Sequence, residues 1–391
     1  MVACSVLGNG CHRLSVHIDL NVLSDSYDGE NQYSLLDDDK EEDKGGEDDD
    51  DDDEKQCLQT ALHPFNNQVS GHVTLMCADE FHLFKPYCER EANFYKEMPP
   101  EIANFTPAFC GEVKLEMQDG CENFVVSPST SFTGGRKQCT FCQDRKFSTV
   151  INRSPRKTPT KGVVYRDAGS GAVNAINPWA AECRLRKSKP DNQWRIQGAN
   201  YYIIIENITR FYQFPCVLDL KIGTRQHGDG VNEKKVIRFK NKCERSTSKK
   251  YGIRLGGMQY YDSTSSVFQC ANKYQGEALS FDQMQECILN FFTDAATHSL
   301  RRQLCVHVIK RLEELKKALL LVDGCRLFSA SLLIAYDGDP NAVCDKNECV
   351  RVCLVDFAHA TWKGVGDIEY TGPDDGVILG VETMLSILKA F

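Results

Sequence analysis

The sequence predicts an α+β fold, in which strands and helices are mixed along most of the chain. Two observations support this prediction. The stretch YYIIIENITRFYQFPCVLDLKIG at 201–223 contains two β-rich runs around a polar break. Over 300–319, apolar residues recur at steps of three and four, as on one face of a long amphipathic helix. A chain of 391 residues is long enough for two lobes with tails or insertions besides.

Residues 1–60 are predicted to form a disordered acidic tail. The run 37–54 contains fourteen acidic residues and two lysines, so it carries a charge of −12 by itself. Like charges repel, and the segment has too little apolar surface to offset the cost of ordering. The formal net charge of −9 therefore leaves +3 for the remainder of the chain. The tail could bind basic protein partners, although a solvated tail is the favoured interpretation.

Residues 61–126 are predicted to be folded. The segments 69–76 and 81–86 predict two short strands around an Ala-Asp-Glu turn. Residues 89–98 predict a short helix, which ends at a Pro-Pro pair.

Residues 127–193 are predicted to be a flexible insertion. They are rich in Ser, Thr, Pro, Gly, Lys and Arg, most clearly in NRSPRKTPTK at 152–161. These basic clusters could be a nuclear-import signal, but a solvated loop is favoured. Residues 194–214 return to folded structure and lead into the last segment, 215–391.

The last segment contains the remaining predicted elements. Besides the helix at 300–319, the stretches 326–341 and 349–360 predict two strands joined by a turn, because each has an apolar run bounded by turn residues. Residues 377–388 predict a final helix.

Composition and missing patterns exclude several classes of protein. The nineteen cysteines are odd in number and show no modular spacing, so a secreted disulfide framework is not expected. Cys139 and Cys142 form a CxxC pair without a second pair at a matching distance, which favours reduced thiols over zinc. Neither a secretory signal nor an apolar run of about 18 residues is evident. We expect a protein of the cytosol or nucleus, with no membrane or nucleic-acid partner.

Familiar nucleotide-binding motifs are also absent. The chain has no G-x-x-x-x-G-K-[ST] loop and no H-R-D-L-x-x-x-N catalytic loop. Gly169-Ser170-Gly171 lies in the predicted insertion and fits neither a dinucleotide fingerprint nor a nucleophile elbow. Any nucleotide site must therefore be built differently.

Three groups of residues could carry chemistry. In PCVLDLKIG at 215–223, Asp219 and Lys221 are two apart in a strand and therefore share a face. Asp356 ends an apolar strand, where a carboxylate is costly unless a cation or donors satisfy it, so it is a plausible Mg²⁺ ligand. Lys85 follows a strand, and Glu91 lies six residues later on the next helix, as in kinase sites that hold ATP phosphates. Taken singly, each group is also explained by an ordinary ion pair.

Together these residues resemble the inositol polyphosphate kinase family. Its signature Pro-x-x-x-Asp-x-Lys-x-Gly is present as PCVLDLKIG, followed in order by SLL at 331–333 and DFAH at 356–359. The strings DLKIGTRQHGD, STS, GMQYY and GPDDGVILG are more similar to the inositol hexakisphosphate kinases than to the multikinase or trisphosphate 3-kinase branches. HPFNNQVSGH at 63–72 and the stretch that follows resemble the N-terminal lobe of that subfamily.

The resemblance implies a two-lobed fold related to the protein kinases, with ATP and Mg²⁺ in the cleft. Residues 61–126 would form the N-terminal lobe, 194–214 its end and the hinge, and 215–391 the C-terminal lobe. Catalytic roles fall to Lys221 and Asp219. The implied ATP-binding residues are Lys85, Glu91, Glu206, Ile208 and Asp219, with adenine on the backbone of Glu206 and Ile208. The implied metal ligands are Asp356 and Ser331, and the implied substrate-binding residues are Lys221, Lys235 and Lys242.

The sequence departs from the family pattern beside Lys242. An arginine common at the preceding position is Asn241 here, and Lys240 could compensate for it.

The leading hypothesis is an inositol hexakisphosphate kinase, which makes a diphosphoinositol polyphosphate from ATP and inositol hexakisphosphate, with inositol pentakisphosphate as a further candidate substrate. One alternative is an inositol polyphosphate multikinase that phosphorylates ring hydroxyls of less phosphorylated inositols. A second alternative is a scaffold that binds inositol phosphates without catalysis. The presence of Lys85, Asp219, Lys221, Ser331 and Asp356 argues against the scaffold, because a binding module need not keep all five.

Overall fold

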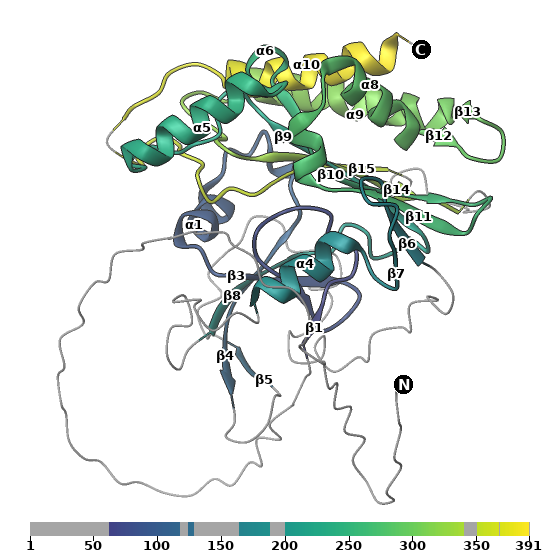
Figure 1. The fold of residues 1–391 in the computed structure, drawn as a ribbon. Coiled ribbons are helices and arrows are strands. Elements are labelled where there is room, and N and C mark those ends of the chain that lie inside the picture. Colours follow the sequence, from purple (N-terminus) through teal and green to yellow (C-terminus); the bar gives the residue numbers. More distant parts are fainter. Residues whose placement is uncertain are drawn as a thin grey trace, which may run out of the picture. The chain divides into compact units, whose positions relative to one another are not determined.

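The structure is a computed structural model that describes residues 62–117, 124–128, 164–187, 200–339, 350–366 and 368–390. Within these residues the elements form two larger sheets, one two-stranded sheet and a set of helices (Figure 1). The α+β prediction is confirmed. No helix in the described part of the chain combines the length and the apolar character that crossing a bilayer requires.

The first sheet is built mainly from the N-terminal part of the chain. Its strand order is β1-β2-β3-β8-β4-β5, and the ladders are antiparallel. Helix α1 and the 3₁₀ helix η1 lie between β3 and β4 in the sequence. The bounds are β1 His63–Pro64, β2 Met76–Cys77, β3 His82–Pro86, α1 Glu89–Glu97, η1 Ala103–Phe105, β4 Phe109–Met117, β5 Phe124–Pro128 and β8 Asn200–Glu206. The predicted strand at 81–86 and the predicted helix at 89–98 are thereby confirmed.

The predicted strand at 69–76 is wrong, because most of this segment is a loop. The side chain of Gln68 replaces a strand partner: its Nε2 donates to the carbonyl oxygens of Ser70 and Val73 at 2.8 and 2.7 Å, and its Oε1 accepts from the amide of Leu75 at 3.0 Å. Gly71 has a φ of +89°, a conformation that turns the chain and interrupts an extended strand. Apolar alternation alone could not show that a local side chain would satisfy these backbone groups.

The second sheet has the order β15-β14-β9-β10-β11-β6-β7 and carries most of the predicted site. The pairs around β9 are antiparallel, and β11 pairs with β6 in parallel. The bounds are β6 Val164–Asp167, β7 Val173–Asn174, β9 Pro215–Ile222, β10 Ile253–Asp262, β11 Val267–Ala271, β14 Ser331–Asp337 and β15 Val350–Val355. The two strands predicted around the signature are therefore β8 and β9, and they belong to different sheets.

Part of the predicted flexible insertion is regular structure instead. Within 127–193, residues 164–187 form β6, β7 and α4 Pro178–Lys187. Asn177 donates from Nδ2 to Gln259 of β10 at 2.7 Å and accepts from the amide of Trp179 at 2.8 Å, which begins the helix. The Trp179 side chain is buried. The polar composition of residues 127–193 did not indicate these contacts, because one buried tryptophan and one hydrogen-bonded asparagine hardly change the average composition of the range.

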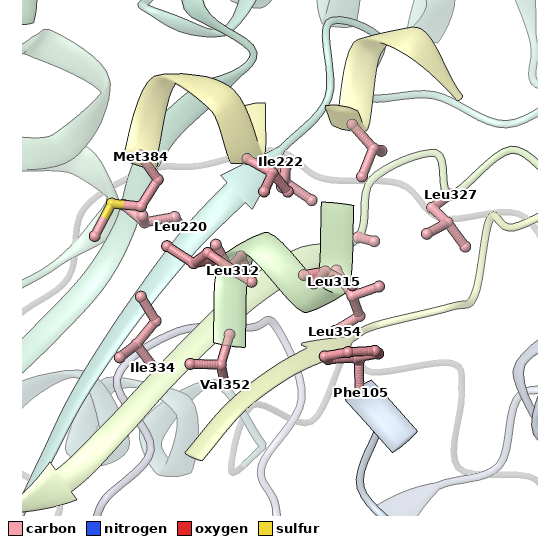
Figure 2. Close-up of a cluster of buried hydrophobic side chains, with 14 of the residues drawn as sticks. Phe105, Leu220, Ile222, Leu312, Leu315, Leu327, Ile334, Val352, Leu354 and Met384 are labelled. Atoms are coloured by element: carbon pink, nitrogen blue, oxygen red, sulfur yellow. The ribbon is translucent and has the colours of Figure 1, made fainter. Parts of the chain in front are cut away.

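Helices cover one face of the second sheet. Leu220 and Ile222 of β9, Ile334 of β14 and Leu354 of β15 pack against α9 and α10 (Figure 2). Because strand side chains alternate between faces, the residues between them point to the opposite face. The predicted helices at 300–319 and 377–388 are confirmed as α9 and α10. The helix bounds are α5 Glu233–Arg245, α6 Ser248–Tyr251, α7 Lys273–Ala278, α8 Phe281–Phe291, α9 Arg302–Leu321 and α10 Asp375–Lys389, and the hairpin strands are β12 Thr293–Asp294 and β13 Ser299–Leu300.

Several predictions lie outside the described residues. These are the disordered tail at 1–60, the Cys139–Cys142 pair, and the remainder of the insertion at 129–163 and 188–193.

Candidate functional site

The site begins on the face of the second sheet that the helices leave uncovered. Asp219 and Lys221 lie two residues apart on β9, and the core residues Leu218 and Leu220 alternate with them. In the ladder between β14 and β9, Ser331 is the register partner of Lys221. Cross-strand partners point to the same side of a sheet, so Ser331 and Lys221 are neighbours on this face.

A network of four charges joins this face to the first sheet. Asp356, directly after β15, accepts from Lys85 Nζ at 2.8 Å through Oδ1 and from Lys221 Nζ at 2.9 Å through Oδ2. Lys85 also donates to Glu91 Oε1 of α1 at 2.8 Å, and that oxygen accepts from the amide of Phe357 at 3.1 Å. Asp356 has a φ of +67°, an unusual conformation for a residue other than glycine. The neighbouring hydrogen bonds hold the carboxylate in this position.

The electrostatics of the network keep Asp356 and Lys85 charged. Burial alone would raise the pKa of Asp356, but Lys221 and Lys85 together hold it well below its usual range. Burial would lower the pKa of Lys85, but Asp356 and Glu91 raise it above the ordinary lysine value. At neutral pH Asp356 is therefore ionised and Lys85 is protonated.

Asp219 lies deeper, with 2% of its surface exposed. Burial raises the pKa of its carboxyl group, and Lys221 opposes this effect in part. The Ser70 hydroxyl, from the loop between β1 and β2, donates to Oδ2 of Asp219. The backbone also approaches closely here: a Cβ on Gly257 would lie 1.9 Å from the Val69 carbonyl oxygen, so only glycine fits at that position. The loop 65–75 thus closes over Asp219.

The predicted hinge connects the two sheets between β8 and β9. The Glu206 carboxylate accepts from the guanidinium of Arg351 at 3.0 and 3.1 Å and also from Arg210. Burial would raise the pKa of Glu206, but its hydrogen bond to Arg351 lowers it overall. The side chain is therefore engaged in holding the hinge, and the amide of Glu206 donates to the carbonyl oxygen of Ala108 at 2.9 Å. Among the described residues, the amide nitrogen of Ile208 has no backbone acceptor.

The two predicted substrate lysines lie on helix α5. Lys235 and Lys242 are seven residues apart, so they share one flank of the helix, at about 100° per residue. Lys242 pairs with Glu277 of α7 at 2.6 Å. Lys240 points to nearly the opposite flank, and its charge adds to burial in lowering the pKa of His227. The structure thus separates Lys240 from Lys242, whereas the sequence suggested that Lys240 could compensate beside Lys242 for the arginine that Asn241 replaces.

The structure brings two residues to the network that the sequence analysis did not single out individually. Ser70 reaches Asp219 from a loop that was predicted to be a strand. His359 lies three residues after Asp356; burial lowers the pKa of its imidazole, and the charges of Arg90 and Lys221 lower it further. His359 is part of DFAH, so its place in the motif was the available signal. Ser70 lies in HPFNNQVSGH, but that string does not indicate its partner, because the contact spans 149 residues of sequence.

The residues present fit a divalent cation held jointly with phosphate groups. Asp356 offers an ionised carboxylate whose side chain is 30% exposed. Ser331 Oγ and Asp219 Oδ1 are buried neighbours, yet neither completes a hydrogen bond of good geometry to another described residue. Among those residues, no cluster of three or more His, Cys, Asp or Glu side chains could enclose a metal ion alone. Mg²⁺ is commonly bound in this way, by one or two carboxylates and the phosphates of a substrate.

Comparisons with known proteins identify the family. A family model described as inositol polyphosphate kinase matches residues 202–389. Human inositol hexakisphosphate kinase 3 is 30% identical, over 84% of this chain and 94% of the relative. Inositol hexakisphosphate kinase 1 of Rattus norvegicus and human inositol hexakisphosphate kinase 2 are each 29% identical over 84% of this chain, and the matches cover 93% and 94% of those relatives.

Among solved structures, the inositol phosphate multikinase Ipk2 of S. cerevisiae, crystallised with ADP and Mn²⁺, aligns with a TM-score of 0.49 at 20% identity, over 80% of this chain and 99% of that one. The sequence relatives, which this chain spans almost completely, decide the assignment. The chain belongs to the inositol polyphosphate kinase family, and its activity is that of an inositol phosphate kinase.

Proposed function

We propose that this protein transfers the γ-phosphate of ATP to a phosphate group of inositol hexakisphosphate and so forms a diphosphoinositol polyphosphate. The observation that carries the proposal is the network in which Asp356 bridges Lys85 and Lys221. Relatives named inositol hexakisphosphate kinases match along 84% of the chain, which supports the choice of this substrate over less phosphorylated inositols.

On the nucleotide side, Lys85 holds ATP phosphates, and Glu91 orients it through their 2.8 Å contact. Asp356, helped by Ser331, holds Mg²⁺, which supplies charge neutralisation on the phosphate oxygens when it is bound. Asp219 binds the ribose. Adenine binds to the backbone of the hinge at Glu206 and Ile208; the engagement of the Glu206 side chain by Arg351 supports this backbone role.

On the acceptor side, Lys221 lies between the transferred phosphate and the inositol phosphate. Lys235 and Lys242 bind other phosphate groups of the substrate from their shared flank of α5. Phosphoryl transfer depends mainly on alignment and on positive charge where negative charge accumulates. Two polyanions repel each other, so the Lys221 ammonium offsets the largest electrostatic cost of bringing them together.

A phosphate oxygen as the attacking nucleophile is consistent with the residues proposed for the acceptor side. A phosphate oxygen of inositol hexakisphosphate is already anionic at neutral pH, since the second pKa of a phosphate monoester is about 6. Such a nucleophile needs no general base. A ring hydroxyl, the acceptor of a multikinase, would gain from one.

The test is a substrate panel. Purified full-length protein is incubated with ATP, Mg²⁺ and, separately, inositol hexakisphosphate, pentakisphosphates and less phosphorylated inositols, and the products are resolved by charge. We expect a product more anionic than inositol hexakisphosphate, its loss when Mg²⁺ is omitted, and its loss in Lys221→Ala. Unchanged inositol hexakisphosphate beside phosphorylation of ring hydroxyls would refute the proposal in favour of a multikinase activity. No turnover of any inositol phosphate would favour a scaffold.

Cysteine chemistry supports the cytosol or nucleus as the place of action. The eleven cysteines within the described residues are all free, as expected where thiols stay reduced. The acidic tail offers a surface for basic protein partners. Imaging of the tagged full-length chain, with and without residues 1–60, tests the location and the contribution of the tail.

A further inference from the structure

Arg254 stands beside the catalytic lysine without an assigned role. It lies on β10, where Lys221 of β9 is its register partner. Its neighbours Ile253 and Leu255 belong to the core on the helix-covered side, so Arg254 projects to the opposite side, the one that carries Lys221. Only 5% of the residue is exposed.

The guanidinium has no partner in the described structure. The side chain of Arg254 makes no hydrogen bond or ion pair with any residue that the structure describes, and its Nε is fully buried without an acceptor. Burying an unpaired charge is costly, and arginine keeps its charge in proteins. An arginine in this state therefore indicates an anion that the described residues do not supply.

The nearest carboxylates do not supply that anion, because other groups engage them. Glu277 and Asp219 are close enough to influence the Arg254 charge. However, Glu277 is paired with Lys242 at 2.6 Å, and Asp219 accepts from Ser70. Three cations, Lys221, Arg254 and Lys242, thus surround a region whose acids are already partly neutralised.

We propose that Arg254 binds a phosphate group of the inositol phosphate acceptor. This inference rests on the proposed function and adds a residue to the acceptor side. The planar fork of arginine suits bidentate contact with a phosphate group, and a buried position strengthens each contact.

The position of Arg254 in the sheet favours the acceptor over ATP. The order β15-β14-β9-β10 places Asp356, which contacts Lys85, at one side of Lys221 and Arg254 at the other. Arg254 pairs with Lys221, whereas Asp219 pairs with Gly257 nearer the hinge end of β9. A phosphate at Arg254 therefore lies beyond the transferring phosphate, away from the nucleotide's Lys85.

Steady-state kinetics on Arg254→Met and Arg254→Lys test the proposal. We expect the KM for inositol hexakisphosphate to rise about 10- to 100-fold in Arg254→Met, the range of a lost charge-assisted hydrogen bond. The KM for ATP should stay within about twofold, and Arg254→Lys should recover part of the loss. Arg311→Met is the matched control, because Arg311 pairs with Glu314 on α9 and should leave both constants unchanged.

A substrate series supplies a readout that a purely structural role would not change. Pentakisphosphates that each lack one phosphate are compared on wild type and Arg254→Met. If Arg254 binds one phosphate, the penalty of the substitution shrinks for the isomer without that phosphate. An equal penalty for every isomer would overturn the proposal and leave Arg254 as a counter-charge for Asp219 and Glu277. A rise in the KM for ATP alone would place the bound phosphate on the nucleotide and also refute it.

Two further measurements cover the cases in which Arg254→Met does not fold or the wild type uses another substrate. If Arg254→Met does not fold, the same series on Arg254→Lys, with equilibrium binding of inositol hexakisphosphate, decides the question. If wild type acts on another inositol phosphate instead, the proposed substrate fails, and the Arg254 comparison is made on the substrate that is used.

Discussion

The strongest prediction concerns Asp356→Asn, because this substitution keeps the shape of the side chain but removes its charge. In the folded protein, each carboxylate oxygen accepts from a different lysine, at 2.8 Å from Lys85 and 2.9 Å from Lys221. The amide retains one oxygen acceptor and replaces the other with an N–H donor. One lysine then faces a donor, and the two ammonium groups lose the anion between them.

The magnitude follows from these two contacts. A hydrogen bond to a charged group contributes about 1.5–3 kcal/mol. Because the Asp356 side chain is 30% exposed, the lower end of that range applies. One such bond is lost and the other keeps a neutral acceptor in place of a charged one, which together give about 2 kcal/mol of lost stability, or roughly 4 °C in Tm at about 2 °C per kcal/mol for a large domain. Turnover should fall by at least about 10³-fold, because the proposed metal ligand is lost as well.

Thermal unfolding without nucleotide and steady-state kinetics at saturating Mg²⁺ measure the two effects separately. Asp262→Asn is the control, since Asp262 caps an exposed turn at Thr264 and Ser265. We expect it to retain turnover and lose at most about 1 kcal/mol. If Asp356→Asn unfolds at the wild-type temperature and turns over normally, both the bridging geometry and the metal assignment are refuted. If only the stability falls, Asp356 is structural.

Four further predictions test other parts of the molecule. Lys221→Ala should lower turnover by orders of magnitude, while binding of a nucleotide analogue falls only modestly. Lys221→Arg should restore little activity, because a guanidinium fork is not a compact ammonium. Near-normal turnover of Lys221→Ala would mean that Lys221 only forms an ion pair. The pKa of His359 is lowered in the folded protein, so near its ordinary pKa of about 6.5 the unfolded chain binds more protons, and the stability falls as the pH drops through that range. The Tm of His359→Gln should therefore fall less than the wild-type Tm between about pH 7.5 and 5.5. An equal fall contradicts the assignment. Gly257→Ala should destabilise by about 1–3 kcal/mol in denaturant unfolding, because the new Cβ meets the Val69 carbonyl; an unchanged midpoint would mean that the loop does not pack there. Removal of residues 1–60 should leave turnover within about tenfold, which corresponds to ~1.4 kcal/mol of barrier, and a larger loss would assign the tail to the catalytic unit.

Local periodicity was sufficient for much of the site. Alternation along a strand put Asp219 and Lys221 on one face, and the ladder of β9 with β14 agrees. The spacing from Lys85 to Glu91 gave a strand lysine and a helix glutamate, which meet at 2.8 Å. These relations depend on backbone geometry within a few residues, so the sequence expresses them directly.

Other features depend on contacts between distant segments, and the tertiary structure alone decided them. Asp356 meets Lys85 across 271 residues, and Ser70 meets Asp219 across 149. The strand predicted at 69–76 is mostly a loop, because the hydrogen bonds that Gln68 makes to its backbone do not show in an apolar pattern. Arg254 looks like any strand arginine until the register places it beside Lys221. The sequence by itself determined which chemical groups were available and how short segments turn; only packing decided which groups are buried together, because burial and charge pairing arise from all elements at once.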